Sequence, residues 1–156
     1  MSVVVSDTSP LHYLILCGAE EILRCLFRQV VIPPTVFREL QQPNTPARVK
    51  QWASALPSWA NVQAPHTLNL TLDVGAGELE AISLAQEIRA AAVLMDDRAG
   101  HVAVVGTLGL LEQAPLGGLV DLPDVIARLQ QTNARLDPKL ILAALDRDKA
   151  RKQAQK

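Results

Sequence analysis

The chain has 156 residues, of which 15 are basic and 16 are acidic, so its formal net charge is −1. This length suffices for one domain with a buried core, and the balanced charge excludes the strongly basic field that drives non-specific nucleic-acid binding. Hydrophobic residues make up 49% of the chain but aromatic residues only 3%, which indicates an aliphatic, helix-rich globular protein. A polyanionic partner would therefore need a local basic patch or a metal ion.

The chain lacks the features of a membrane or secreted protein. No stretch approaches the roughly 18 apolar residues that a membrane span requires, and no basic region precedes the first apolar run. We therefore expect a soluble, cytoplasmic protein with no membrane partner. Cys17 and Cys25 fall in apolar helical sequence without metal-ligand spacing, so we expect two buried free thiols.

The N-terminal stretch predicts a buried strand that ends at a carboxylate. Residues Val3–Val5 form a β-branched run without polar alternation, which is typical of a parallel strand covered on both faces. Asp7 follows, and Ser9-Pro10 then has the pattern of an N-cap with proline at the first helical position. In open α/β sheets, ligands bind at this carboxyl edge. The plainer alternative is that Asp7 only caps this turn through its own side chain.

The remaining elements alternate between helices and short strands, as expected for an α/β protein. We expect helices at 11–16, 19–27, 35–40, 46–56, 73–89, 108–113, 121–131 and 137–149, and strands at 29–32, 61–64, 91–95 and 102–107. No repeat or long linker divides the chain. We therefore expect one domain over residues 1–145 and a basic, frayed C-terminal tail over residues 146–156.

The strand at 91–95 repeats the opening pattern, because it ends on Asp96-Asp97. Only residues 98–101 separate this pair from the last strand, whereas a parallel crossover normally needs a dozen or more residues. The last strand is therefore antiparallel, pairs elsewhere, or has lost its crossover helix.

Five carboxylates occupy positions that can converge at one sheet edge. Asp7, Asp96 and Asp97 follow strands, while Glu39 and Glu78 lie near the starts of helices. Clustered carboxylates repel one another and raise their proton affinity, so a bound cation would explain them. Oxygen ligands without cysteine or suitable histidine indicate Mg²⁺ or Mn²⁺. Such an ion can polarise a phosphate and lower the pKa of an attacking water. Each residue alone also has a plainer interpretation as a surface, helix-start or turn residue.

The order of several short motifs resembles that of the PIN-domain family, in its bacterial VapC-like branch. The matching motifs are Asp-Thr-Ser-Pro-Leu, Ile-Pro-Pro-Thr-Val-Phe-Arg-Glu-Leu, Gly-Glu-Leu-Glu-Ala-Ile-Ser-Leu-Ala, Leu-Met-Asp-Asp-Arg-Ala-Gly and Gly-Thr-Leu-Gly, at residues 7–11, 32–40, 77–85, 94–100 and 106–109. The resemblance implies a three-layer αβα sandwich with a short, mainly parallel sheet. It also implies a Mg²⁺- or Mn²⁺-dependent ribonuclease like the VapC-type toxins.

The resemblance also assigns roles by position to acidic and hydroxyl side chains. These are Asp7 as the first metal ligand, Glu39 as the second acid, Glu78 as the third, Asp96 or Asp97 as the fourth and a further metal ligand, and Thr8 or Ser9 as an assisting hydroxyl.

One segment departs from the family pattern. Relatives usually carry a helix between the Asp-Asp-Arg and Gly-Thr-Leu-Gly stretches, with an arginine near the place of His101, and here about two to three helical turns are missing. We expect a metal-dependent ribonuclease, a toxin of a toxin–antitoxin pair or a relative of one. Its expected partners are RNA, a cognate antitoxin and a second copy of the chain.

Two alternatives stand beside the ribonuclease. A catalytically degenerate PIN-like domain would bind a protein or RNA without cleaving it. A phosphoacceptor receiver domain fits less well, because it would carry an acidic pair after its first strand, where this chain has Ser6-Asp7. It would also carry a lysine after its last strand, and none occurs between Lys50 and Lys139.

Overall fold

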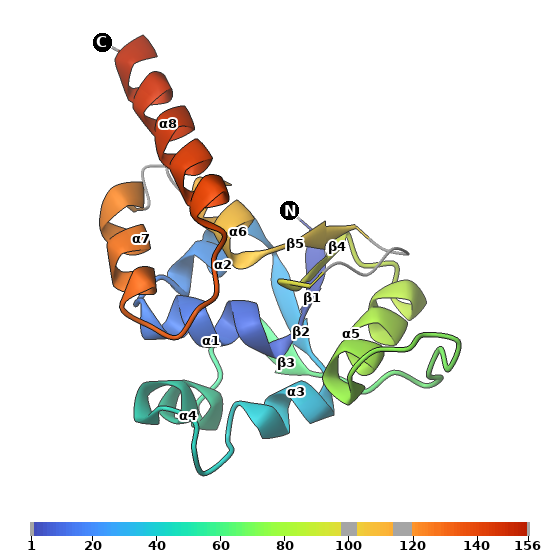
Figure 1. The fold of residues 1–156 in the computed structure, drawn as a ribbon. Helices are drawn as coiled ribbons and strands as arrows, with labels where there is room; N and C mark the ends of the chain where they lie inside the picture. The colour runs from blue at the N-terminus through green and yellow to red at the C-terminus, as the bar shows by residue number, and fades with distance from the viewer. Residues whose placement is uncertain (1, 98–102, 114–119, 156) are drawn as a thin grey trace.

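A sheet of five parallel strands forms the centre of the computed structural model, which describes residues 2–97, 103–113 and 120–155. The strands lie in the order β3-β2-β1-β4-β5 (Figure 1). They are β1 (Val3–Ser6), β2 (Gln29–Ile32), β3 (Ala60–Val62), β4 (Ala92–Leu94) and β5 (Val104–Val105). The α/β fold with a short parallel sheet is therefore confirmed.

Helices cover both faces of this sheet and complete three layers (Figure 1). They are α1 (Thr8–Leu16), α2 (Glu21–Leu26), α3 (Pro34–Glu39), α4 (Ala47–Ser54), α5 (Ala76–Glu87), α6 (Thr107–Gln113), α7 (Leu122–Gln130) and α8 (Pro138–Ala154). Helix α5 packs on one face, while α1, α2, α6 and α7 pack on the other. None of the helices in the described ranges is long and apolar enough to cross a membrane.

The valines of β1 show why this strand lies in the middle of the sheet. Successive strand residues point to opposite faces, and Val4 belongs to the larger core while Val5 belongs to the core under α5. Both valines are fully buried, and burial of each such side chain stabilises the fold by about 1.5–3 kcal/mol. A β-branched run without polar alternation therefore predicts correctly a strand covered on both sides.

The last strand is parallel to its neighbour despite its short connection. Val93 pairs with Val104 and Leu94 pairs with Val105, so the antiparallel alternative is wrong. The strand is also shorter than residues 102–107, because α6 already begins at Thr107. Residues 98–102 of the connection lie outside the described residues, including the arginine of the Asp-Asp-Arg stretch and His101.

Two helix starts differ from the prediction. The N-cap of α1 is Asp7, with extended backbone angles (φ −78°, ψ 174°), and not Ser9. Pro10 occupies the third helical position and not the first, and it is accommodated there because the first four helical N–H groups have no partner within the helix. Helix α5 begins at Ala76 after Gly75, three residues later than expected.

The C-terminal helix continues beyond the expected domain end. Asp148 is 2% exposed and forms ion pairs with Arg151 (3.1 Å) and Lys152 (2.9 Å) of the same helix. Lys152 also reaches Asp121, the N-cap of α7, at 2.8 Å. These contacts hold residues 146–154 in helix α8, where a frayed tail was expected, and the domain boundary at residue 145 stays a prediction.

The two cysteines occupy different environments. Cys17 is buried, as expected, but Cys25 is exposed, and both thiols are free. Helix α2 buries Ile22 and Leu23 instead, so Cys25 lies on its solvent side. The prediction of two buried thiols is therefore wrong for Cys25.

Candidate active site

Asp7 lies where β1 passes into α1, at the carboxyl edge of the sheet. Its backbone N–H donates to the carbonyl of Leu94 (2.9 Å), which ties it to the end of β4. Its side chain makes no helix-capping hydrogen bond, although Asp7 occupies the N-cap position, and the residue is only 8% exposed. Capping of the turn therefore does not account for this carboxylate.

The electrostatics of Asp7 identify the acids around it. The pKa of Asp7 is raised from 3.8 to about 6, and burial is the largest cause. The backbone amide of Thr8 lowers this pKa, while the charges of Glu78, Glu39 and Asp96 also raise it. Four of the five predicted acids therefore lie close enough at this sheet edge for their charges to interact.

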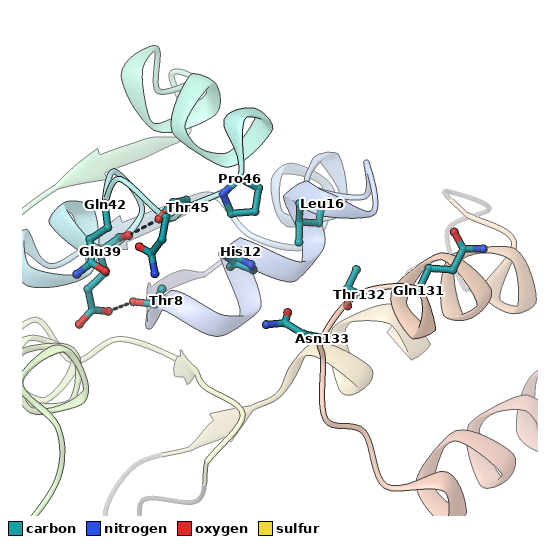
Figure 2. A pocket seen from close by; sticks show the side chains of 11 residues that line it. Thr8, His12, Leu16, Glu39, Gln42, Thr45, Pro46, Gln131, Thr132 and Asn133 are labelled. Carbon is teal, nitrogen blue, oxygen red and sulfur yellow. Dashed lines mark hydrogen bonds between the residues drawn. The ribbon is translucent and has the colours of Figure 1, made fainter.

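Glu39 is the last residue of α3 and is held by two threonines (Figure 2). The Thr8 hydroxyl donates to the Glu39 carboxylate, and the Thr45 hydroxyl donates to its backbone carbonyl (3.0 Å). Ser9 lies one residue further along α1 and makes no side-chain hydrogen bond among the described residues. Of the two predicted hydroxyls, Thr8 is the one in contact with an acid.

Gly77, in the first turn of α5, allows Asp7 and Glu39 to approach each other. A Cβ atom at this position would lie 3.3 Å from Glu39 Oε1 and 3.4 Å from Asp7 Oδ1. The first distance is tighter than most van der Waals contacts and the second is at their lower limit, so a side chain here would require the Glu39 carboxylate to shift.

The two glutamates of α5 serve two different helix starts. Glu78 accepts a hydrogen bond from the Gly75 N–H (3.1 Å) at the start of its own helix. Glu80 accepts from the Thr35 N–H (2.8 Å) and so caps α3. Their divergent directions match the angle expected from helical geometry. Sequence patterns do not reveal the Glu80 contact, because α3 is distant in the chain.

Asp96 is held at the start of α6 by Thr107. Its Oδ1 accepts from the Thr107 N–H (2.7 Å), and its Oδ2 accepts from the Thr107 hydroxyl (2.9 Å). Gly106 leaves room for this contact, since a Cβ there would lie 3.1 Å from Asp96 Oδ1. Both aspartates of the pair are exposed, but Asp97, unlike Asp96, is not among the charges that act on Asp7. Asp96 is therefore the member of the pair that faces the other acids.

Thr107 is a site residue that sequence reasoning missed. It is 1% exposed, and the pattern placed it at the end of a strand and not at a helix start. The signal that could have found it is the Gly-Thr pair itself, because threonine favours helix starts and its hydroxyl bonds nearby polar groups.

The acids match the ligand preference of a hard divalent cation. Among the described residues, no three His, Cys, Asp or Glu side chains gather closely enough to hold an ion by themselves. Mg²⁺ is nevertheless usually bound by one or two carboxylates, with waters and substrate phosphates completing its coordination. Asp7 and Glu39, which converge beside Gly77, meet that requirement.

Two cavities border the acids. The larger, about 710 Å³, includes Thr8 and Glu39 in its wall (Figure 2). The smaller, about 300 Å³, is lined by Asp96 together with Arg135 and Arg147. Arg147 is paired with Glu112 (2.8 Å), whereas Arg135 forms no ion pair within the described ranges. Arg135 therefore supplies a local positive charge of the kind that the balanced composition requires for a polyanionic partner.

Comparison with known proteins identifies the family. A family model, DUF3368, described as a PIN domain, matches residues 3–150. No curated protein and no solved structure matched the chain. PIN domains are generally nucleases, which agrees with carboxylates gathered at the carboxyl edge of a parallel sheet. The chain belongs to the PIN-domain family.

Proposed function

We propose that this protein is a Mg²⁺- or Mn²⁺-dependent ribonuclease that hydrolyses RNA phosphodiester bonds with water as the nucleophile. The observation that carries the proposal is the convergence of Glu39, Glu78 and Asp96 on the buried Asp7, whose pKa their charges raise. Repulsion in a carboxylate cluster of this kind lowers the stability of the fold. A role in binding or chemistry explains why such a cluster is present. The proposed metal ligands are Asp7 and Glu39, which meet beside Gly77, with Asp96 as a neighbouring acid; Asp97 is not among the charges that act on Asp7.

A divalent cation bound there would supply Lewis acidity toward a phosphate oxygen and lower the pKa of water. The protein's own groups provide the position and the charge. With a pKa of about 6, Asp7 is deprotonated in roughly nine of ten molecules at pH 7, so it can accept a cation without a large proton release. The Thr8 hydroxyl donates to the Glu39 carboxylate and so helps to fix its position.

The RNA backbone needs a positive group beside the acids, and Arg135 is placed to provide one. It lines the cavity that Asp96 also lines. Its charge and that of Asp96 act in opposite directions on the pKa of Tyr13, which burial raises. Arginine binds phosphate through a planar fork of donors, so Arg135 can hold a phosphate adjacent to the one that is cleaved.

The toxin assignment rests on the resemblance to the VapC-like branch. A toxin of this type would be neutralised by an antitoxin and would pair with a second copy of itself. Leu140 and Leu142 of α8 are 57% and 61% exposed, and such apolar side chains favour contact with a partner chain. Co-purification of the protein with the product of an adjacent gene, and its mass in solution, would test these partners.

Cleavage of a random-sequence, end-labelled RNA in Mn²⁺ and in EDTA tests the proposed activity. We expect cleavage by the wild type in Mn²⁺ only, and loss of at least about a hundredfold in rate for Asp7→Asn. Asp97→Asn, purified in parallel, controls for contaminating ribonuclease and for unspecific charge loss, and should cleave like the wild type. Equal cleavage by Asp7→Asn and wild type would contradict the assignment.

A catalytically degenerate PIN-like domain is the second candidate. Two observations favour it: the shortened connection between β4 and β5, and the engagement of both Asp96 oxygens by Thr107. This reading predicts RNA or protein binding that is unaffected by Mn²⁺ and by Asp7→Asn. The ribonuclease reading predicts that Asp7→Asn binds RNA more weakly in Mn²⁺ than the wild type does, because a metal would bridge the protein and the phosphate.

A further inference from the structure

The larger cavity beside the acids is lined mainly by neutral polar side chains. Its volume of about 710 Å³ lies within the range of pockets that take small molecules. Three separate parts of the chain form it: α1, the loop between α3 and α4, and the loop that follows α7 (Figure 2). Its polar groups come chiefly from four amide side chains, Gln42, Asn44, Gln131 and Asn133.

The charge of the cavity disfavours a phosphate as its occupant. Glu39 is the only acidic residue in its wall, and none of the described lining residues is a lysine or arginine. Burial lowers the pKa of His12, so its imidazole is neutral at pH 7. A phosphate held by the cavity wall would meet a carboxylate and no lysine or arginine, whereas a neutral group with donors and acceptors needs no such partner.

Several of the amides are free to bind a ligand. Within the described residues, the side chains of Gln42, Asn44 and Gln131 make no hydrogen bond to the chain. Asn133 accepts only a long hydrogen bond from the Tyr13 hydroxyl (3.4 Å), so its N–H₂ group remains available. Amides that both donate and accept can match the edge of a nucleobase, as asparagine and glutamine do with adenine.

The imidazole ring of His12 lies in the same cavity as these amides and provides a flat surface on which a base can stack. Figure 2 shows His12 on α1 between Thr8 and Glu39 on one side and Gln131–Asn133 on the other. RNA-binding proteins stack unpaired bases on aromatic and histidine side chains and read their edges with polar groups. The cavity therefore combines a stacking surface and edge-reading groups directly next to the acids that would bind the scissile phosphate.

We propose that this cavity holds one unpaired nucleobase of the RNA, next to the cleaved bond, and that Gln131 and Asn133 read its edge and so set the base preference of cleavage. This inference rests on the proposed ribonuclease function and extends it to the selection of the substrate.

Side-chain amide resonances of ¹⁵N-labelled protein provide the first test. The probes are the four nucleoside 5′-monophosphates and inorganic phosphate, each added in Mg²⁺ at pH 7.5. We expect one or two of the nucleotides to shift the Asn133 and Gln131 amide signals, with inorganic phosphate leaving them unchanged. Equal shifts with phosphate alone, or no shift with any nucleotide, would overturn the base pocket.

Cleavage of random-sequence RNA in Mn²⁺ provides the second test, with base frequencies at the cleaved bond read by sequencing. Gln131→Ala with Asn133→Ala should reduce the wild-type base preference about tenfold, as expected for the loss of hydrogen bonds to the base. Gln51→Ala on the exposed face of α4 is the matched control and should keep the preference.

The two tests separate the two proposals. An unchanged preference in the double variant overturns the base pocket while the ribonuclease stands. Absence of any cleavage by the wild type overturns the ribonuclease, and the resonance test still decides whether the cavity binds a base. Thermal midpoints of the variants, measured alongside, should lie close to that of the wild type, because neither amide is buried.

Discussion

Neutralising Asp7 is expected to make the metal-free protein more stable, although the residue lies at the centre of the site. A rise of the pKa from 3.8 to about 6 corresponds to a cost of about 3 kcal/mol for the charged form in the folded state. Asp7→Asn removes this charge with little change of shape but loses the interaction with the Thr8 amide. We therefore expect a net gain of about 1–3 kcal/mol in the free energy of unfolding at pH 7.5 in EDTA, or roughly 2–12 °C in thermal midpoint.

The sign of the effect depends on pH. Because the folded-state pKa is higher than the unfolded value, the wild type is favoured by protonation of Asp7 at low pH and loses that stability as the pH rises from about 4 through 6. The advantage of Asp7→Asn should therefore shrink to about 1 kcal/mol or less at pH 4.5. Urea unfolding of both proteins at pH 4.5 and 7.5 measures this difference.

Mn²⁺ should reverse the order of stability. The wild type gains free energy by mass action, about 2.7 kcal/mol when the ion is present at a hundred times its dissociation constant. Asp7→Asn should gain less, whereas Asp97→Asn should respond like the wild type. A variant Asp7→Asn that is less stable than the wild type at pH 7.5 in EDTA would refute the reasoning, because Asp7 would then carry no electrostatic cost.

Three further substitutions test the contacts that hold the acids and the last helix. Thr8→Val removes the hydroxyl that donates to Glu39. RNA cleavage in Mn²⁺ should slow by about ten- to a hundredfold, as expected for the loss of a hydrogen bond to a charged group, while the thermal midpoint changes little. An unchanged rate would show that Glu39 needs no positioning by Thr8. Thr107→Val removes the hydroxyl bond to Asp96 and should lower the free energy of unfolding by about 1–2 kcal/mol in urea, with Thr45→Val as a comparison of similar size. Asp148→Ala leaves Arg151 and Lys152 without their buried partner and should lower the free energy of unfolding by about 1–3 kcal/mol. Faster amide hydrogen exchange in the last turns of α8 would accompany that loss, and unchanged exchange would mean that other contacts hold the helix.

Local patterns predicted the sheet and much of the site because their causes are local. An apolar run such as Val3–Val5 must be covered on both sides, and the carboxylate after it must then lie at the carboxyl edge of a strand. The same reasoning placed Asp96 at that edge, and parallel pairing of β1 with β4 brings it near Asp7. The identities of four of the acids around the site could therefore be anticipated from residue order alone.

Contacts between distant segments could not be predicted in this way. The cap that Glu80 provides to Thr35 joins residues 45 positions apart, and the larger cavity needs the loop after α7 to lie against α1. The parallel pairing of β5 was also not predicted, because its connection to β4 is shorter than the dozen or so residues that a parallel crossover usually needs. Burial of Asp148 within a basic stretch was equally unforeseen, because it depends on packing against other helices and not on local composition.

The helix starts around the site have a consequence for assembly of the enzyme. The N–H groups at the beginnings of α5, α6 and α3 already receive Glu78, Asp96 and Glu80. The partial positive charge of a helix start favours a carboxylate in the absence of any ion. Backbone amides thus already hold Glu78 and Asp96 in the folded chain, and an ion bound as we propose would chiefly neutralise Asp7 and Glu39.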